Sequence, residues 1–237
     1  YYRTANTIHY FFYKNLLFIM PQFLYSFYNL SSATSLYHPI MLISFNMLFT
    51  SFPILVFGLT EKNISEDLLE AYPRLYRINH KNKLMNYSAF LAWLLMGALQ
   101  AIICFYLIYI IWGSHTPFLE SGKMAGTIGF ASILFTALVF GVTLKLYFVS
   151  KNRTYLFDLV SILSCLALPL TFLICSLFDM SRLFDDNSLY RQFLALLKSP
   201  FYWLAILTTT AAMVVPEVIM YVREQITYYR ALNSVVE

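Results

Sequence analysis

The residues with the clearest chemical potential in this sequence are polar side chains inside long apolar runs. Lys14 stands within the run 8–29, and Asn46 and Thr50 stand within the run 39–59. A lysine at the centre of a membrane-spanning helix costs about 2.5–3.5 kcal/mol on insertion scales, so its presence calls for a partner or a ligand. An ammonium group beside an amide suits an anionic or zwitterionic ligand, because the ammonium donates and the amide both donates and accepts.

The run 39–59 carries a second signal. Asn46, Thr50 and Pro53 follow at spacings of four and three residues, which places them on one helical face. Pro53 has no N–H, so the carbonyl of Phe49 loses its helical partner and the segment is weakened. Interrupted helices at membrane depth are tolerated where they line a cavity or a transport path. The alternative is that these polar groups only hold neighbouring helices together.

Lys14 has two interpretations as well. It lies six residues inside the run 8–29, or about 9 Å deep at 1.5 Å per residue. It either extends its ammonium back to the membrane surface or faces the helix bundle and binds a ligand or counter-ion. If the first two runs are antiparallel neighbours, Lys14 and Asn46 differ by about 10 Å in depth. The long lysine side chain, with a shift of a few residues in the span boundaries, can close this gap and bring Lys14 into contact with Asn46.

The elements that must position these residues are membrane-spanning helices. Hydrophobic residues make up 59% of the 237 residues and charged residues 12%, whereas a soluble domain carries roughly 25% charged residues. About 20 apolar residues cross a membrane as a helix, and strands of a membrane barrel are half as long and alternate. We therefore predict an all-α integral membrane fold, a six-helix transmembrane bundle forming a single domain over 1–237. The predicted spans are 8–29, 39–59, 87–112, 125–149, 155–178 and 200–222.

The basic residues between the spans predict the orientation. One side of the up-and-down arrangement carries ten of them: Arg3, Lys62, Arg74, Arg77, Lys81, Lys83, Lys151, Arg153, Arg223 and Arg230. The other side carries Lys123, Arg182, Arg191 and Lys198. Since basic residues concentrate in cytoplasmic loops, both termini are predicted to be cytoplasmic. The net charge of +4 is then a topological signal, and nucleic-acid binding is not indicated.

Signatures of soluble enzymes and metal sites are absent from the sequence. The three cysteines lie in apolar stretches without a disulfide framework or metal-ligand spacing. There is no phosphate-binding G-x-x-x-x-G-K-[ST] loop, no H-E-x-x-H and no G-x-S-x-G. Lys145, Asp158 and Glu217 stand near cytoplasmic span ends, where extension of the side chain to the membrane surface or pairing at the interface is expected. The sequence starts on Tyr1 and runs almost directly into apolar residues, so we expect a fragment of a longer protein.

Several segments resemble one family of membrane pumps. Residues 11–15 (Phe-Phe-Tyr-Lys-Asn) and 21–25 (Pro-Gln-Phe-Leu-Tyr) are similar to the fifth transmembrane helix of the type-IV P-type ATPases, the phospholipid flippases. Residues 46–53 (Asn-Met-Leu-Phe-Thr-Ser-Phe-Pro) resemble the sixth helix. The linker residues 58–65 and 72–76 resemble the loop that follows, and 135–145 and 203–206 resemble the eighth and tenth helices. The similarity is closest to the animal subgroup that transports aminophospholipids.

The resemblance implies an ATP-driven pump that moves phosphatidylserine and phosphatidylethanolamine from the outer to the cytoplasmic leaflet. Such pumps use Mg²⁺ and ATP in domains that are absent from this chain, and usually have a glycosylated accessory subunit of β type at the outer loops. The implied membrane is the plasma membrane or a Golgi or endosomal membrane. The implied substrate residues are Lys14 and Asn46, with Asn15 and Thr50 as adjacent candidates and Pro53 as the helix break.

Two alternatives remain from the sequence alone. The chain can be a stand-alone six-helix channel or secondary transporter that does not use ATP, although no inverted repeat is visible. It can also be a bundle without transport activity, whose polar residues serve packing only.

Overall fold

The fold is an all-helical membrane bundle, which confirms the predicted fold class. A computed structural model describes residues 1–30, 32, 34–62, 70, 85–113, 126–151, 154–177 and 192–236. Regular structure in these ranges is helical throughout, without a strand. The elements are α1 (Tyr2–Tyr28), α2 (Pro39–Ser44), the π-helix η1 (Phe45–Phe49), α3 (Ser51–Thr60), α6 (Tyr87–Gly113), α7 (Gly126–Val149), α8 (Tyr155–Leu177), α10 (Gln192–Lys198) and α11 (Pro200–Val236).

The six predicted spans correspond to α1, the broken helix α2–η1–α3, α6, α7, α8 and α11. Five helical stretches in the described ranges are long and apolar enough to cross a membrane, and α1 is not among them. Helix α1 has 27 residues and therefore enough length, but Lys14, Asn15 and Gln22 lower its hydropathy. Its crossing of the membrane stays a prediction. Helix α11 extends well beyond the predicted end at 222 and finishes at Val236.

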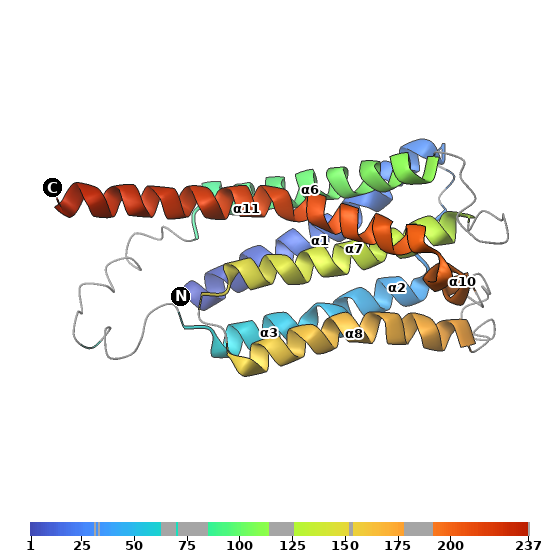
Figure 1. The fold of residues 1–237 in the computed structure, drawn as a ribbon, viewed down its shortest axis with the longest axis horizontal. Coiled ribbons are helices and arrows are strands. Elements are labelled where there is room, and N and C mark those ends of the chain that lie inside the picture. Colours follow the sequence, from blue (N-terminus) through green and yellow to red (C-terminus); the bar gives the residue numbers. More distant parts are fainter. Residues whose placement is uncertain are drawn as a thin grey trace.

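The helices form three layers (Figure 1). Helices α1 and α7 lie in the middle, with α6 and α11 on one side and the broken helix and α8 on the other. In α7, 78% of the most apolar stretch is buried inside the bundle, whereas the other four candidate spans bury 28–44% of theirs. Helix α7 is therefore the central helix. Small residues permit this close packing, because lipid-surrounded helices associate by contact rather than by hydrophobic exclusion. Those buried on α7 include Gly129, Ala131, Ser132, Ala137 and Gly141.

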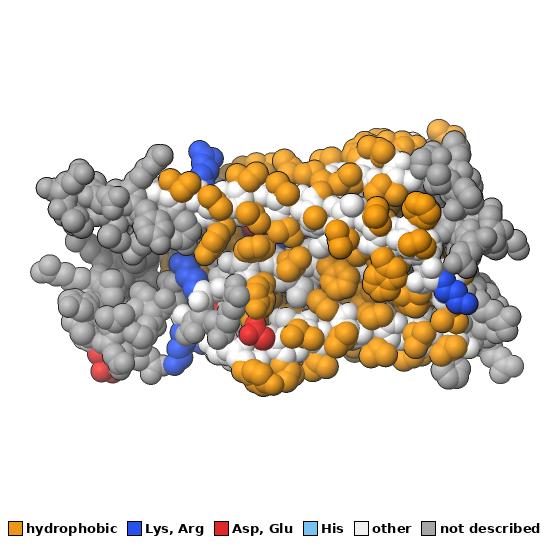
Figure 2. Space-filling model, viewed as in Figure 1, with side chains coloured by type: hydrophobic (Ala, Val, Ile, Leu, Met, Phe, Trp, Pro, Cys, Tyr) orange, Lys and Arg blue, Asp and Glu red, His pale blue; other side chains and the backbone are white. Residues whose placement is uncertain are grey.

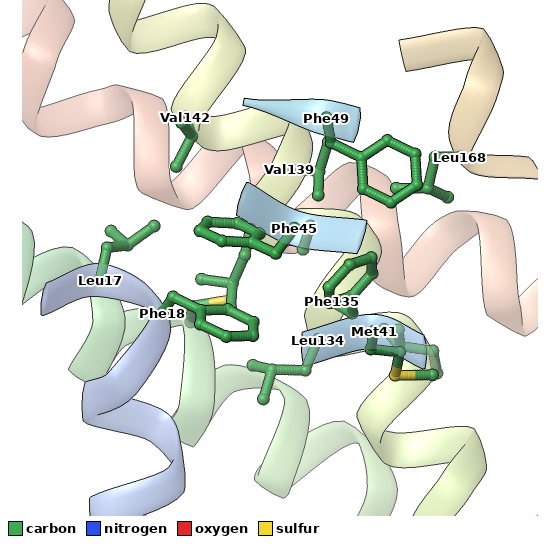
Figure 3. Packing of buried hydrophobic residues seen from close by; sticks show 14 of the residues in the cluster. Leu17, Phe18, Met41, Phe45, Phe49, Leu134, Phe135, Val139, Val142 and Leu168 are labelled. Atoms are coloured by element: carbon green, nitrogen blue, oxygen red, sulfur yellow. The ribbon is translucent and has the colours of Figure 1, made fainter. Parts of the chain in front are cut away.

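Aromatic side chains fill the contact between the middle layer and the broken helix (Figure 3). The rings of Phe18 from α1 and Phe45 from η1 stack at 4.1 Å, and Phe18 also stacks on Tyr37 at 4.6 Å. Phe135 of α7 meets Phe18, Phe45 and Phe49 edge-on. Such pairs contribute about 0.5–1.5 kcal/mol each beyond their buried area. They fix α1 against the interrupted segment.

Both chain ends lie at the same end of the bundle (Figure 1). Two basic side chains anchor the start of α1 there. The Arg3 guanidinium donates to the Leu59 carbonyl at 2.8 Å, and the Lys151 ammonium lies 5.5 Å from the Tyr2 ring centroid. On the face drawn in Figure 2, hydrophobic side chains cover the middle and basic side chains lie near the ends. A cytoplasmic location for the end with the termini stays a prediction.

Many of the residues behind the predicted orientation lie outside the described residues. They are Arg74, Arg77, Lys81, Lys83, Lys123, Arg153, Arg182 and Arg191, together with the side chain of Arg230. The family-like linker segments 63–65 and 72–76 lie outside them as well. At the described start of that linker, the buried Glu61 carboxylate accepts hydrogen bonds from Ser150 Oγ and the Lys151 amide, both at 2.8 Å. This contact ties the end of α3 to the end of α7.

Candidate functional site

The second span is interrupted by one π-helical turn, η1. The Thr50 amide donates to the carbonyl of Phe45, five residues back, at 3.2 Å, and the Thr50 hydroxyl donates to the same oxygen at 2.8 Å. Turns of this kind inside α-helices are rare, and those that do occur are often found at functional sites. The helix is continuous from Pro39 to Thr60 apart from this turn.

Side-chain hydroxyls donate to two carbonyls of the interruption. The Ser51 hydroxyl donates to the carbonyl of Asn46. The Phe49 carbonyl, which Pro53 cannot serve, accepts a hydrogen bond from the hydroxyl of Ser164 on α8. At membrane depth an unsatisfied carbonyl is costly, so these bonds stabilise the interruption. Pro53 itself is the third residue of α3, where a missing N–H is tolerated, and the break precedes it at Phe45–Phe49.

Lys14 of α1 points into this interruption. Its ammonium donates to Asn46 Oδ1 at 3.1 Å and to Thr50 Oγ1 at 2.7 Å, and lies 5.3 Å from the ring centroid of Phe11. Lys14 is only 2% exposed and Thr50 1%, so the ammonium does not extend to the membrane surface. The predicted approach of Lys14 to Asn46 is therefore confirmed as a direct contact.

The members of this cluster differ in accessibility. Asn46 is exposed on the bundle surface, and its amide N–H groups have no hydrogen-bond partner within the described ranges. Thr50 is buried and already engaged, since its hydroxyl accepts from Lys14 and donates to the Phe45 carbonyl. Asn15 is half-buried and makes no hydrogen bond to the other three in the part of the chain that the structure describes. The structure thus brings together Lys14, Asn46 and Thr50 but leaves Asn15 apart.

The charge of Lys14 is not neutralised inside the described structure. Both of its hydrogen-bond acceptors are neutral oxygens, and it forms no ion pair with the described residues. An ammonium in this setting is under-compensated, because burying a charge is costly unless an opposite charge accompanies it. The cluster can therefore complete itself by accepting an anionic group beside Asn46.

A second buried lysine shows the opposite arrangement. Lys145 of α7 forms an ion pair with Glu217 of α11 at 2.5 Å, and both side chains are 8% exposed. The Lys145 ammonium also lies 4.4 Å from the ring centroid of Trp93. The expectation of surface extension or interfacial pairing is therefore wrong for Lys145 and Glu217, because they pair while buried in the bundle.

Sequence reasoning missed two members of this second cluster. The Gln100 side-chain amide donates to Glu217 Oε1 and to the Met213 carbonyl, both at 3.0 Å, and the Tyr13 hydroxyl donates to Gln100 Oε1. The available signal was Gln100 itself, the only amide side chain in an otherwise apolar α6. Tyr13 gave no such signal, because tyrosines occur throughout this sequence.

A resident metal is not supported by the described side chains. No group of three or more His, Cys, Asp or Glu side chains is placed to hold an ion in the ranges that the structure describes. Magnesium, which the resemblance implies, finds no such donor set among the described residues.

Comparisons with known proteins agree on one family. The family model for the phospholipid-translocating P-type ATPase C-terminal region matches residues 1–230. Human "Phospholipid-transporting ATPase IG" is 34% identical over 226 residues, which cover 95% of this chain and 20% of the relative. Mouse "Phospholipid-transporting ATPase 11C" is 36% identical over 223 residues, covering 94% and 20%. Arabidopsis thaliana "Probable phospholipid-transporting ATPase 5" is 27% identical over 235 residues, covering 98% and 18%. The chain spans about one fifth of the length of these relatives.

Proposed function

This chain belongs to the phospholipid-translocating P-type ATPases, as their C-terminal membrane region, and we propose that it supplies part of the lipid path of a flippase. The lipids it carries are aminophospholipids, phosphatidylserine and phosphatidylethanolamine, and the direction is from the outer to the cytoplasmic leaflet. The alternative of a stand-alone channel or secondary transporter loses its support, because the relatives named for phospholipid transport are ATPases.

The observation that supports this proposal most directly is the Lys14 cluster. A buried ammonium bound to two neutral oxygens provides a positive site without its own counter-ion. A phospholipid headgroup brings a phosphate, and phosphatidylserine also brings a carboxylate. Ionic hydrogen bonds to such groups are roughly twice as strong as neutral ones. The headgroup would therefore replace the counter-ion that Lys14 lacks.

The exposed position of Asn46 gives the headgroup a point of contact. Its amide oxygen holds the Lys14 ammonium while its N–H groups remain available on the surface of the interruption. An amide can donate to a phosphate or carboxylate oxygen, so Asn46 can contact the lipid while it orients Lys14. Thr50 completes the arrangement by fixing Lys14 to the π-helical turn.

The remaining components of the pump belong to the rest of the protein. The relatives are about five times as long as this chain, and that additional sequence is where we place ATP hydrolysis with Mg²⁺. A glycosylated accessory subunit of β type at the outer loops, and location in the plasma membrane or a Golgi or endosomal membrane, complete the proposal.

The test uses the full-length pump in lipid vesicles and in cells. Lys14→Ala and Asn46→Ala should each lower phosphatidylserine-stimulated ATP turnover roughly ten- to hundredfold, since a hydrogen bond to a charged group contributes about 1.5–3 kcal/mol. Uptake of fluorescent phosphatidylserine and phosphatidylethanolamine should fall in parallel, with phosphatidylcholine as the comparison lipid. Asn15→Ala is measured alongside, because the geometry gives it a smaller effect.

The matched control is Lys198→Ala, which removes an exposed lysine at the end of α10. It should leave turnover and uptake unchanged. Wild-type rates in both Lys14→Ala and Asn46→Ala would refute the proposed headgroup site. Equal stimulation by phosphatidylcholine in the wild-type pump would refute the aminophospholipid selectivity.

A further inference from the structure

A chain of buried hydrogen bonds crosses four helices one residue away from Lys14. Tyr13 of α1 donates to Gln100 of α6, Gln100 donates to Glu217 of α11, and Glu217 pairs with Lys145 of α7. We call Tyr13, Gln100, Glu217 and Lys145 the buried polar bridge. Tyr13 is 0% exposed and Gln100 1%, so their bonds do not compete with water. The bridge joins the middle layer of the bundle to the layer of α6 and α11.

Two glycines bring the helices of this bridge close together. A Cβ atom on Gly97 would lie 3.2 Å from the backbone oxygen of Tyr13 and 3.0 Å from its ring. A Cβ atom on Gly141 would lie 2.5 Å from the end of the Met213 side chain. Gly97 precedes Gln100 by one turn, so α1 approaches α6 closely near the point where Tyr13 reaches Gln100. At Gly97 the approach is set by the Tyr13 backbone, whereas at Gly141 the nearest atoms belong to the Met213 side chain.

Tyr13 and Lys14 are consecutive on α1 and point about 100° apart around the helix axis. The Tyr13 hydroxyl is held by α6, while the Lys14 ammonium reaches the interrupted helix on the other side. Rotation or sliding of α1 would displace the Lys14 ammonium, and it would also break the bond between Tyr13 and Gln100. The bond therefore opposes such a movement. The bridge thus restricts where Lys14 places its charge.

We propose that Tyr13 and Gln100 are positioning residues that hold α1 in the register in which Lys14 presents its ammonium to the lipid headgroup. This inference rests on the proposed function of Lys14. Lys145 neutralises Glu217, and Glu217 orients the Gln100 amide so that its oxygen faces Tyr13. The energetic role of the bridge is to populate the binding-competent arrangement before the lipid arrives, because a partly populated arrangement weakens apparent affinity in proportion.

The experiment compares Tyr13→Phe with Tyr10→Phe in the full-length pump. Tyr10 is a matched control on the same helix: it is 1% exposed and donates to the Val142 carbonyl at 3.3 Å, but it takes no part in the bridge. Tyr13→Phe should raise the mole fraction of phosphatidylserine that gives half-maximal ATP turnover about fivefold, the effect of one ordinary hydrogen bond. The maximal turnover should change less than twofold. Tyr10→Phe should change neither quantity.

Thermal stabilisation by dioctanoyl phosphatidylserine provides a second measurement that does not depend on turnover. The same lipid should bind Tyr13→Phe about fivefold more weakly. In an Asn46→Ala background the Tyr13→Phe effect should shrink, because both changes act through the Lys14 ammonium and neighbouring effects are not additive. Gln100→Leu should reproduce Tyr13→Phe in both measurements.

The outcomes separate this inference from the proposed function. If Lys14→Ala and Asn46→Ala are defective while Tyr13→Phe matches Tyr10→Phe, only the positioning role is wrong. If Tyr13→Phe lowers maximal turnover and thermal stability with an unchanged half-maximal lipid fraction, the bridge is structural only and the inference is overturned. If Lys14→Ala and Asn46→Ala behave as wild type, the proposed function itself fails.

Discussion

Replacing Glu217 by Gln tests how much the bundle depends on its internal ion pair. At 2.5 Å and an effective dielectric constant of about 20, the attraction between Lys145 and Glu217 is about 7 kcal/mol. Desolvation of the two ions, several kcal/mol each, cancels most of it, so the intact pair contributes little net stability. Removing one partner is different, because it leaves a buried charge uncompensated at a cost of about 3–5 kcal/mol.

Local contacts reduce this cost for Glu217→Gln. The Lys145 ammonium keeps the Trp93 ring at 4.4 Å, and a desolvated cation over an aromatic face gains about 2 kcal/mol. The new amide can still accept the hydrogen bond from Gln100. We therefore expect a loss of about 1–3 kcal/mol. The double variant Lys145→Met/Glu217→Leu should recover most of it, since it removes both charges together.

The assay is heat-induced loss of the monodisperse full-length protein in detergent, followed by size-exclusion chromatography. Glu217→Gln should lose its monodisperse peak at a clearly lower temperature than wild type. The corresponding temperature of the double variant should lie between those of Glu217→Gln and wild type, or match wild type. Lys198→Gln, an exposed change at the end of α10, serves as the control. An unshifted Glu217→Gln, or a double variant no more stable than the single, would contradict the charge argument.

Two further predictions concern the close contacts that shape the site, and the same assay measures stability for both. Gly97→Ala should destabilise the protein by about 1–3 kcal/mol, because its new methyl group meets the fixed backbone of Tyr13 at 3.2 Å. Gly58→Ala is the control and should be close to neutral, because its nearest contact is at 3.5 Å. Ser164→Ala should cost about 1–3 kcal/mol, because it leaves the buried Phe49 carbonyl without the hydroxyl it accepts from. A wild-type melting temperature would show that the interruption does not need this bond.

The helices were predictable because length and apolar composition determine membrane spans. The boundaries expected at 39–59, 87–112 and 155–178 differ from the observed helices by one residue at most at either end. The approach of Lys14 to Asn46 was also accessible, because both are costly at membrane depth and lie on runs that must be neighbours in a short hairpin. These features follow from local chemistry and from the distance a helix covers per residue.

The remainder of the site depends on contacts that local sequence does not determine. The interruption takes the form of a π-helical turn at Phe45–Phe49, and the proline that signalled it lies in the following helix. The hydroxyl that supports it comes from Ser164, on a helix over a hundred residues away. Gln100 gained its importance only from the packing of α6 against α1 and α11. Partners of this kind are set by tertiary packing.

The two buried lysines of this bundle show how charge can separate a structural role from a binding role. Lys145 and Glu217 cancel each other's charge within the bundle, so their pair holds α7 against α11 without an outside ligand. Lys14 has only neutral acceptors among the described residues, so an anionic ligand changes its energy far more than it changes that of Lys145. Tyr13 and Lys14 stand side by side on α1, and each faces one of these environments. Helix α1 is therefore the element through which the buried polar bridge can constrain the Lys14 cluster.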